Sequence, residues 1–155
     1  MGSINELVKT LTVSQLLMAK GKVVWSIGPD ETVYTALQML AEKNVGALLV
    51  MDSDRLAGIL SERDYARKVI LQGKSSMNTP VREIMTAKVI TISPSDTLGE
   101  CMARMTNNRI RHLPVVENGR VIGLISIGDI VKSVIMQQEF VIEQLENYIA
   151  GERSK

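Results

Sequence analysis

Two seven-residue stretches of this chain carry the same polar residues at the same spacing. Residues 58–64 (the first corner) and residues 123–129 (the second corner) both read Gly-apolar-apolar-Ser-x-x-Asp. Each passes from a predicted strand into a predicted helix, where free amides and the helix dipole attract an anion. The serine adds a donor, and the aspartate suits a vicinal diol, at about 1.5–3 kcal/mol per charge-assisted bond. Phosphate donors beside a diol acceptor indicate a ribonucleotide.

The same pattern also fits a helix cap. In a capping box, a serine accepts a hydrogen bond from the amide three residues later, and the side chain of that later residue bonds back. An isolated corner favours the cap. Because a duplicated fold duplicates its caps, the recurrence of the pattern does not decide between capping and ligand binding.

The corners recur because the chain contains one unit twice. Residues 24–70 overlay residues 89–135 without a gap, and such internal repetition determines the architecture. The identical pairs include Pro29/Pro94, Thr32/Thr97, Gly58/Gly123, Ser61/Ser126 and Asp64/Asp129. Two copies of a half-buried unit predict a pseudo-twofold pair with two related clefts.

Each copy is predicted to contain three strands and two helices in the order β-α-β-β-α. The predicted strands are 24–27, 47–51 and 56–60 in copy one, and 89–92, 113–116 and 121–125 in copy two. Asn118-Gly119 predicts a tight turn. Asp54 takes the equivalent of Gly119 and is expected to adopt positive φ there.

Helix boundaries follow from capping residues and apolar spacing. Thr32 and Thr97 fit N-caps of the first helix in each copy. The second helices begin near Glu62 and near Gly128. Residues 13–17 and 81–85 each predict one helical turn that leads into the first strand of its own copy.

The predicted organisation has four parts. They are a first repeat at 13–71, a polar linker at 72–80, a second repeat at 81–136 and a C-terminal helical extension at 137–155. The last helix runs from Ile130 towards Tyr148 with an irregular apolar stripe. The stripe either covers the core of its own chain or contacts a second subunit.

Composition argues against several classes of function. The 18 basic and 17 acidic residues give a net charge of +1, without the basic surplus of a nucleic-acid binder. Only five residues are aromatic, too few for single-strand stacking platforms. The single Cys101, and the lack of a leader or a long apolar run, lead us to expect a cytoplasmic protein that does not associate with membranes.

The two corners, the ungapped repeat and Arg111-His112-Leu113-Pro114-Val115 together resemble a tandem pair of CBS domains, known as a Bateman module. The resemblance spans roughly residues 13–136. It implies an α/β (α+β) fold with two CBS-type β-α-β-β-α repeats packed about a pseudo-twofold axis. It also implies two clefts for adenosyl ligands, namely AMP, ADP, ATP, S-adenosylmethionine or NAD(H), with no metal required.

The resemblance also implies a set of binding residues. Ser61 and Ser126 would meet phosphate, and Asp64 and Asp129 the ribose hydroxyls. The adenine would lie against the first-strand positions Trp25, Ser26, Ile90 and Thr91. It would also touch the segments Val45-Gly46-Ala47 and Ile110-Arg111-His112, and Pro114 belongs to the same nucleotide-binding set. Arg63, Arg67, Arg109 and Arg111 are candidate phosphate partners, and Gly128 belongs to the second corner. Copy one departs from the family pattern, with Ala47-Leu48-Leu49-Val50 in place of His-Leu-Pro-Val.

No catalytic or metal site is apparent in the sequence. His112 has no nucleophile and orienting group beside it, which favours packing or contact with the ligand edge. Cys101 lies on an apolar helical face and is expected in the core. Trp25 either stacks on a base or fills core space.

These features predict a stand-alone, non-catalytic sensor of adenine nucleotides. It would dimerise through its helices and act in trans on an unidentified effector protein, by shifting the population of two arrangements. The alternative is a constitutive adaptor or structural dimer whose clefts are vestigial.

Overall fold

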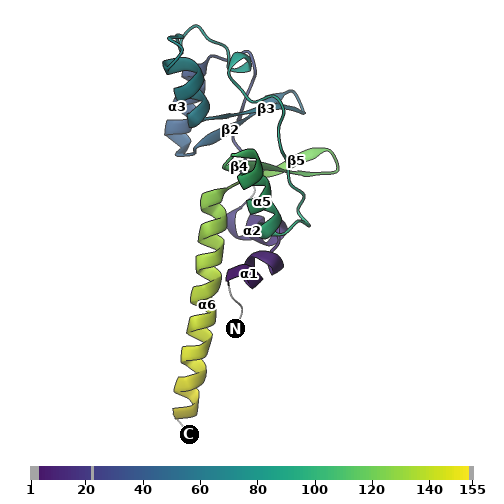
Figure 1. The fold of residues 1–155 in the computed structure, drawn as a ribbon, viewed down its shortest axis with the longest axis vertical. Coiled ribbons are helices and arrows are strands. Elements are labelled where there is room, and N and C mark those ends of the chain that lie inside the picture. Colours follow the sequence, from purple (N-terminus) through teal and green to yellow (C-terminus); the bar gives the residue numbers. More distant parts are fainter. Residues whose placement is uncertain (1–3, 22, 154–155) are drawn as a thin grey trace. The chain divides into compact units, whose positions relative to one another are not determined.

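The computed structural model describes residues 4–21 and 23–153, with side chains up to residue 150 (Figure 1); residues 154–155 of the predicted extension lie outside this part. The helices are α1 (Ile4–Thr10), α2 (Val13–Lys20), α3 (Val33–Lys43), α4 (Glu62–Tyr65), the π-helix η1 (Ala66–Ile70), the 3-10 helix η2 (Val81–Glu83), α5 (Leu98–Asn108) and α6 (Ile127–Arg153). The strands are β1 (Ser26–Ile27), β2 (Ala47–Asp52), β3 (Arg55–Ser61), β4 (His112–Glu117) and β5 (Arg120–Ser126).

The predicted mixed α/β class is confirmed, and copy one shows the predicted order of strands and helices. In copy one, β1 pairs in parallel with β2, and β2 pairs antiparallel with β3. In copy two, β4 and β5 form a two-stranded sheet. The copies differ at their first strand, because 89–92 does not form one.

The prediction of a strand at 89–92 is therefore wrong. Only Ile92 forms a parallel bridge, with Val115. In copy one, Leu49 N donates to Trp25 O at 3.2 Å, which holds β1 against β2. The equivalent of Leu49 in copy two is Pro114, which has no N–H to donate. The carbonyl of Ile90 therefore lacks the corresponding donor, and the pairing shortens.

The turn in copy one also differs from the prediction. Ser53, with φ of 55°, takes the left-handed conformation, whereas Asp54 does not. In copy two both Asn118 and Gly119 have positive φ, as a tight hairpin turn requires. The first turn therefore follows a different backbone path.

Both predicted N-caps are confirmed. Thr32 accepts from Thr35 N at 3.1 Å, and Thr97 accepts from Glu100 N at 3.2 Å. Helices α3 and α5 also end alike, since Asn44 and Arg109 both have φ of 53°. A left-handed C-cap turns the chain sharply towards the next strand.

The chain divides into two compact units. The helical unit contains residues 4–21, 93–113 and 125–153, and the sheet unit contains residues 23–92 and 114–124. The core of the sheet unit is formed by Ile27, Val33, Ala36, Leu40, Leu48, Val50, Leu60, Val69, Val81 and Ile84. In the helical unit the buried residues include Leu16 and Leu17 of α2, Cys101 and Met105 of α5, and Ile130 and Val134 of α6.

Each lead-in segment docks on the other copy instead of its own. Helix α2 precedes copy one but joins the start of copy two, where Val13 N donates to Asp96 O at 2.9 Å. The segment that precedes copy two begins with η2 and joins copy one, where Val81 N donates to Glu31 O at 2.8 Å. Thr86 then bridges Ile59 of β3. This exchange brings residues that are distant in sequence to each corner.

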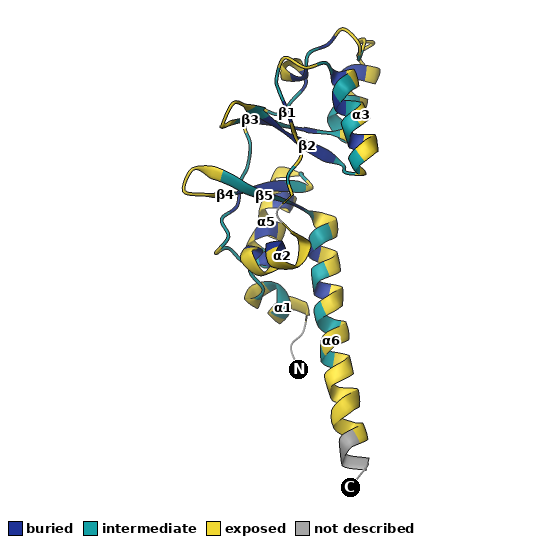
Figure 2. Cartoon of the chain, turned by 180° about the vertical axis from the view of Figure 1, so that it is seen from behind, coloured by how far each residue is buried: buried dark blue, intermediate teal, exposed yellow. Residues whose placement is uncertain are grey.

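Helix α6 is continuous from Ile127 to Arg153. Helices α1, α2 and α5 contact it, and Figure 2 shows its first turns partly buried and its later turns exposed. No helix in the described ranges 4–21 and 23–153 is both long and apolar enough to cross a bilayer.

Candidate functional site

The first corner lies at one end of the sheet unit. The starts of β1 and β2 and the end of β3 meet there, because Ser26 pairs with Leu49 and Ala47 pairs with Ser61. Glu62 N donates to Gly46 O at 3.1 Å. The backbone thus brings together three predicted binding segments, around Trp25-Ser26, Val45-Gly46-Ala47 and Ser61.

Ser61 and Asp64 form a reciprocal capping box at the start of α4. Asp64 N donates to Ser61 Oγ at 3.3 Å, and Ser61 N donates to Asp64 Oδ2 at 2.9 Å. The Ser61 hydroxyl also donates to Oδ2, at 3.0 Å. The capping interpretation of this corner is therefore confirmed.

Capping leaves the Asp64 carboxylate with further capacity. All of its capping bonds go to Oδ2, and a carboxylate has about four lone-pair sites. Oδ1 faces Lys68 Nζ at 3.3 Å, and the Asp64 side chain is only 16% exposed. The shielded carboxylate can cap the helix and accept a ligand hydroxyl at the same time.

Two arginines beside this corner are open to an anion. Arg63 is half-buried and Arg67 is exposed. Neither forms an ion pair with a carboxylate within residues 4–21 and 23–153. Their guanidinium groups match the bidentate geometry of phosphate.

Trp25 is accessible at this end of the sheet. Its side chain is 37% exposed, so it does not simply fill the core. Lys43 Nζ lies 4.3 Å from the ring centroid, in a cation–π contact. A base that stacks on the ring would compete with Lys43 or take the opposite face.

Packing against the lead-in of copy two explains why the first residue of the motif, Gly58, is a glycine. A Cβ at this position would lie 2.6 Å from Met85 Sδ and 2.8 Å from Thr86 O. The lead-in of copy two therefore approaches β3 closely only because residue 58 has no side chain.

The second corner repeats the first in the helical unit. Ser126 N donates to Asp129 Oδ2 at 2.8 Å, and Asp129 N donates to Ser126 Oγ at 3.1 Å. Ile127 N donates to Arg111 O at 2.9 Å, as Glu62 does to Gly46. Gly128 lies exposed in the first turn of α6.

Lys20 distinguishes the second corner. Its Nζ lies 2.6 Å from Asp129 Oδ2, with side-chain exposures of 35% and 23%. The ion pair and the capping bond therefore share one carboxylate oxygen. Lys20 could not be predicted from the sequence, because only the docking of α2 on copy two brings it to this corner.

His112 begins β4 and is half-buried. Burial lowers the pKa of its imidazole, and the positive charges of Lys20 and Arg111 act in the same direction, whereas Asp129 opposes them. The imidazole is therefore neutral at neutral pH. A neutral ring can donate from one nitrogen and accept at the other.

The remaining copy-two candidates do not all lie in the helical unit. Arg109, Ile110, Arg111 and His112 belong to it, whereas Ile90, Thr91 and Pro114 belong to the sheet unit. Arg109 and Arg111 are exposed, and neither forms an ion pair with a carboxylate in the described chain. A common cleft for all these residues stays a prediction.

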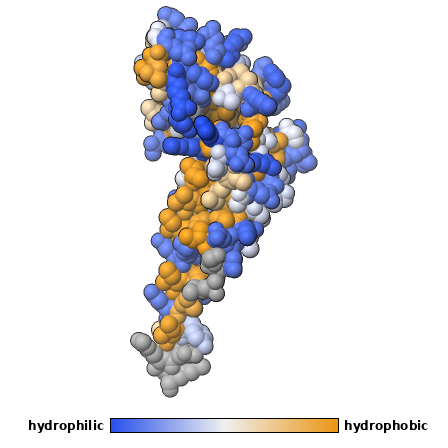
Figure 3. All heavy atoms as spheres, viewed as in Figure 1, coloured by the Kyte–Doolittle hydropathy of each residue, from blue (hydrophilic) through white to orange (hydrophobic). Residues whose placement is uncertain are grey.

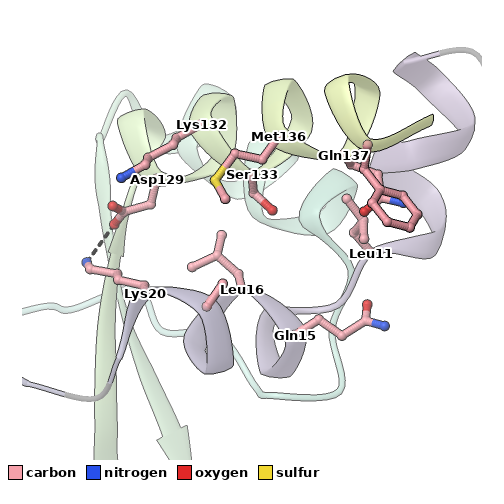
Figure 4. Close-up of a pocket in the computed structure, with 11 residues that line it drawn as sticks. Leu11, Gln15, Leu16, Lys20, Asp129, Lys132, Ser133, Met136 and Gln137 are labelled. Carbon is pink, nitrogen blue, oxygen red and sulfur yellow. Dashed lines mark hydrogen bonds and ion pairs between the residues drawn. The ribbon is translucent and has the colours of Figure 1, made fainter. Parts of the chain in front are cut away.

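A cavity of about 540 Å³ lies between α2 and α6 (Figure 4). Lys20, Asp129 and Lys132 lie at one end, and Leu11, Gln15 and Gln137 lie at the other. Phe140 also lines the cavity. Among the predicted site residues, only Asp129 lines it.

Metal-ligating side chains do not cluster in the described chain, where no group of three or more His, Cys, Asp or Glu residues is placed to hold an ion. Cys101 is fully buried, as predicted. Burial raises the pKa of its thiol to about 12.

Comparison with known proteins agrees with this architecture. The family profile of the CBS domain matches residues 8–70 and 81–135. A mitochondrial CBS domain-containing protein of Arabidopsis thaliana, CBSX3, is 41% identical over 153 residues, covering 92% of this chain and 74% of that protein.

Two solved structures have the same fold. One is described as a putative signal-transduction protein with CBS domains from Burkholderia ambifaria. It shares 55% identity at a TM-score of 0.80, covering 82% of this chain and 96% of that one. The other is the CBS domain pair of protein MJ0100 in complex with 5′-methylthioadenosine and S-adenosyl-L-methionine. It shares 27% identity at a TM-score of 0.70, covering 78% and 97% of the two chains. This chain belongs to the CBS domain family and carries two CBS repeats.

Proposed function

We propose that this CBS pair binds an adenosyl ligand, AMP, ADP, ATP or NAD(H), and regulates a partner protein in trans. The observation that carries the proposal is the pair of matched corners. In each, a shielded carboxylate uses one oxygen, Oδ2, for its capping bonds. Arg63 and Arg67 lie beside the first corner in sequence, and the carbonyl of Arg111 accepts from Ile127 N at the second. A related CBS pair holds two adenosyl ligands.

The first corner supplies groups for each part of such a ligand. Arg63 and Arg67 provide positive charge for the phosphates. The Oδ1 atom of Asp64 accepts a ribose hydroxyl, and binding there displaces or shares the Lys68 ammonium. Trp25 offers an aromatic face for the base. These contacts need no metal ion.

Regulation follows if ligand binding stabilises one arrangement of the protein over another. The free energy of this shift equals the difference between the binding free energies of the ligand for the two arrangements. We propose that the protein acts as a homodimer in the cytoplasm, and that its effector is a separate protein. The chain binds and signals without catalysing a reaction.

The second candidate function is a constitutive adaptor with vestigial clefts. It is favoured by one observation, that both serines and both aspartates already have partners within their own corners. In this case the corners stabilise helices and the surface alone binds a partner.

Calorimetric titration with AMP, ATP and NADH separates the two functions. The sensor predicts saturable heat with at least one of them, whereas the adaptor predicts none from folded protein. Trp25 is the single tryptophan, so its fluorescence reports on the first corner alone. A calorimetric signal without a change in Trp25 emission would assign binding to the second corner.

A further inference from the structure

Helix α6 carries apolar residues with a period of seven. Three consecutive heptads place Val131, Gln138 and Leu145 at position a, Val134, Val141 and Tyr148 at position d, and Ile135, Ile142 and Ile149 at position e. We call these nine residues the α6 seam. Eight of them are apolar or aromatic, and a seven-residue repeat over three heptads is typical of a helix in a left-handed coiled coil.

The chain itself covers little of this seam. The exposed fractions are 51% for Val131, 48% for Ile135, 55% for Ile142, 41% for Leu145 and 49% for Ile149. Val134, at 8%, faces the core of the helical unit instead. Figure 3 shows apolar side chains over much of the part of α6 that is coloured by hydropathy.

The seam is not the face that α2 approaches. The cavity beside α2 is lined by Asp129, Ser133, Met136 and Phe140. At 100° per residue, these four positions lie roughly opposite the a positions of the seam. The other elements of the chain therefore leave the apolar a and e positions of the seam accessible, whereas Val134 at position d is covered.

We propose that the α6 seam pairs with the same seam of a second copy of this chain, as a two-stranded coiled coil. Burying half-exposed aliphatic side chains on both copies removes on the order of 1,000 Å² from water, which reaches the size of specific interfaces. The seam is also self-complementary. In an in-register parallel pair, Gln138 meets its own counterpart, and a single polar a position is a common way to fix register.

The charges of α6 favour a protein partner over a lipid surface. The residues on its polar positions include Glu139, Glu143 and Glu146. Helices that lie on anionic membranes carry Lys and Arg on their polar face instead. The later turns of α6 also need a partner, since isolated helices are marginal in water.

The proposal deepens the proposed homodimer and does not depend on nucleotide binding. Sedimentation equilibrium of the full chain without nucleotide tests it, with Ile142→Glu as the perturbation and Asn147→Glu as the control. Ile142 lies near the middle of the seam, so it meets the partner helix in either orientation, whereas Asn147 lies on the opposite side. Placing a glutamate in an apolar seam should weaken the dimer about 100-fold or more, and Asn147→Glu should change it less than threefold.

Two results would overturn the proposal. One is a wild-type chain that stays monomeric at 100 µM. A modest interface has a roughly micromolar dissociation constant, so a dimer would form at this concentration. The other is equal dimerisation of wild type, Ile142→Glu and Asn147→Glu, which would place the interface elsewhere. Circular dichroism of both variants verifies that they fold. Failure here would leave the calorimetric test of the clefts unaffected.

Discussion

Replacing Asp64 with asparagine separates ligand binding from helix capping at the first corner. Asparagine keeps a side-chain oxygen that can accept from Ser61 N, as Asp64 Oδ2 does at 2.9 Å. It removes the negative charge that would bind a ribose hydroxyl. Alanine at the same position removes both, so the two variants together distinguish the two interpretations.

The expected magnitudes follow from the environment of the carboxylate. Asp64 is 16% exposed, so its bond to a ligand hydroxyl is shielded from water and contributes about 1.5–3 kcal/mol. Asp64→Asn should therefore weaken nucleotide binding about tenfold to 150-fold. The stability loss should stay near 1 kcal/mol, since only the helix-dipole interaction and the partly exposed Lys68 pair are lost. Asp64→Ala should lose about 0.5–2 kcal/mol more, because the cap is lost as well.

Titration of Trp25 fluorescence with ATP and AMP measures affinity, and urea unfolding of the same samples measures stability. Unchanged affinity in Asp64→Asn, together with reduced stability in Asp64→Ala, would refute the reasoning and leave the corner as a cap only. Asp129→Asn is the informative change at the second corner, because Asp129→Ala also removes the cap, whereas both changes remove the ion pair with Lys20.

Three further predictions concern packing and protonation. Gly58→Ala should lower the free energy of unfolding in urea by about 1–3 kcal/mol, because the new Cβ would lie 2.8 Å from Thr86 O. Gly28→Ala is the control, since a Cβ there has only a 3.8 Å contact. Equal unfolding midpoints for the two variants would contradict the close approach. The pKa of His112 is lowered in the folded state, so the unfolded chain binds more protons below about pH 6.5 and stability falls as the pH drops from there. His112→Gln should flatten this dependence between pH 7.5 and 5.5, and identical slopes for the two proteins would argue against a half-buried, neutral ring. Cys101 is fully buried with a thiol pKa near 12, so a thiol reagent should label it only in denaturant; rapid labelling of native protein would disprove this burial.

Local features of the chain were predictable because their physics is local. The caps at Thr32 and Thr97 each need a hydroxyl that accepts from the amide three residues later. This spacing can be read directly from the sequence. The same holds for the two capping boxes and for the Asn118-Gly119 turn. The duplication then predicted the order of elements in copy one and, except for the first strand, in copy two.

Pairing between distant segments was less predictable. The strand at 89–92 is lost because Pro114 has no N–H to donate to the carbonyl of Ile90. This loss can be predicted only when the pairing of these two distant positions is known. The 3-10 helix η2 and the π-helix η1 also depart from the plain helical turns that periodicity indicates. Helix α1 was not predicted.

The amino-acid sequence alone determined the repeated unit, its helix ends and the residue types at each corner, since these depend on neighbours a few positions apart. Tertiary structure alone decided which lead-in serves which corner. Lys20 and Asp129 are 109 positions apart, yet their side chains lie 2.6 Å from each other. No periodicity can encode that contact, because it follows from α2 docking on copy two, where apolar residues of α2, α5 and α6 are buried in the same helical unit.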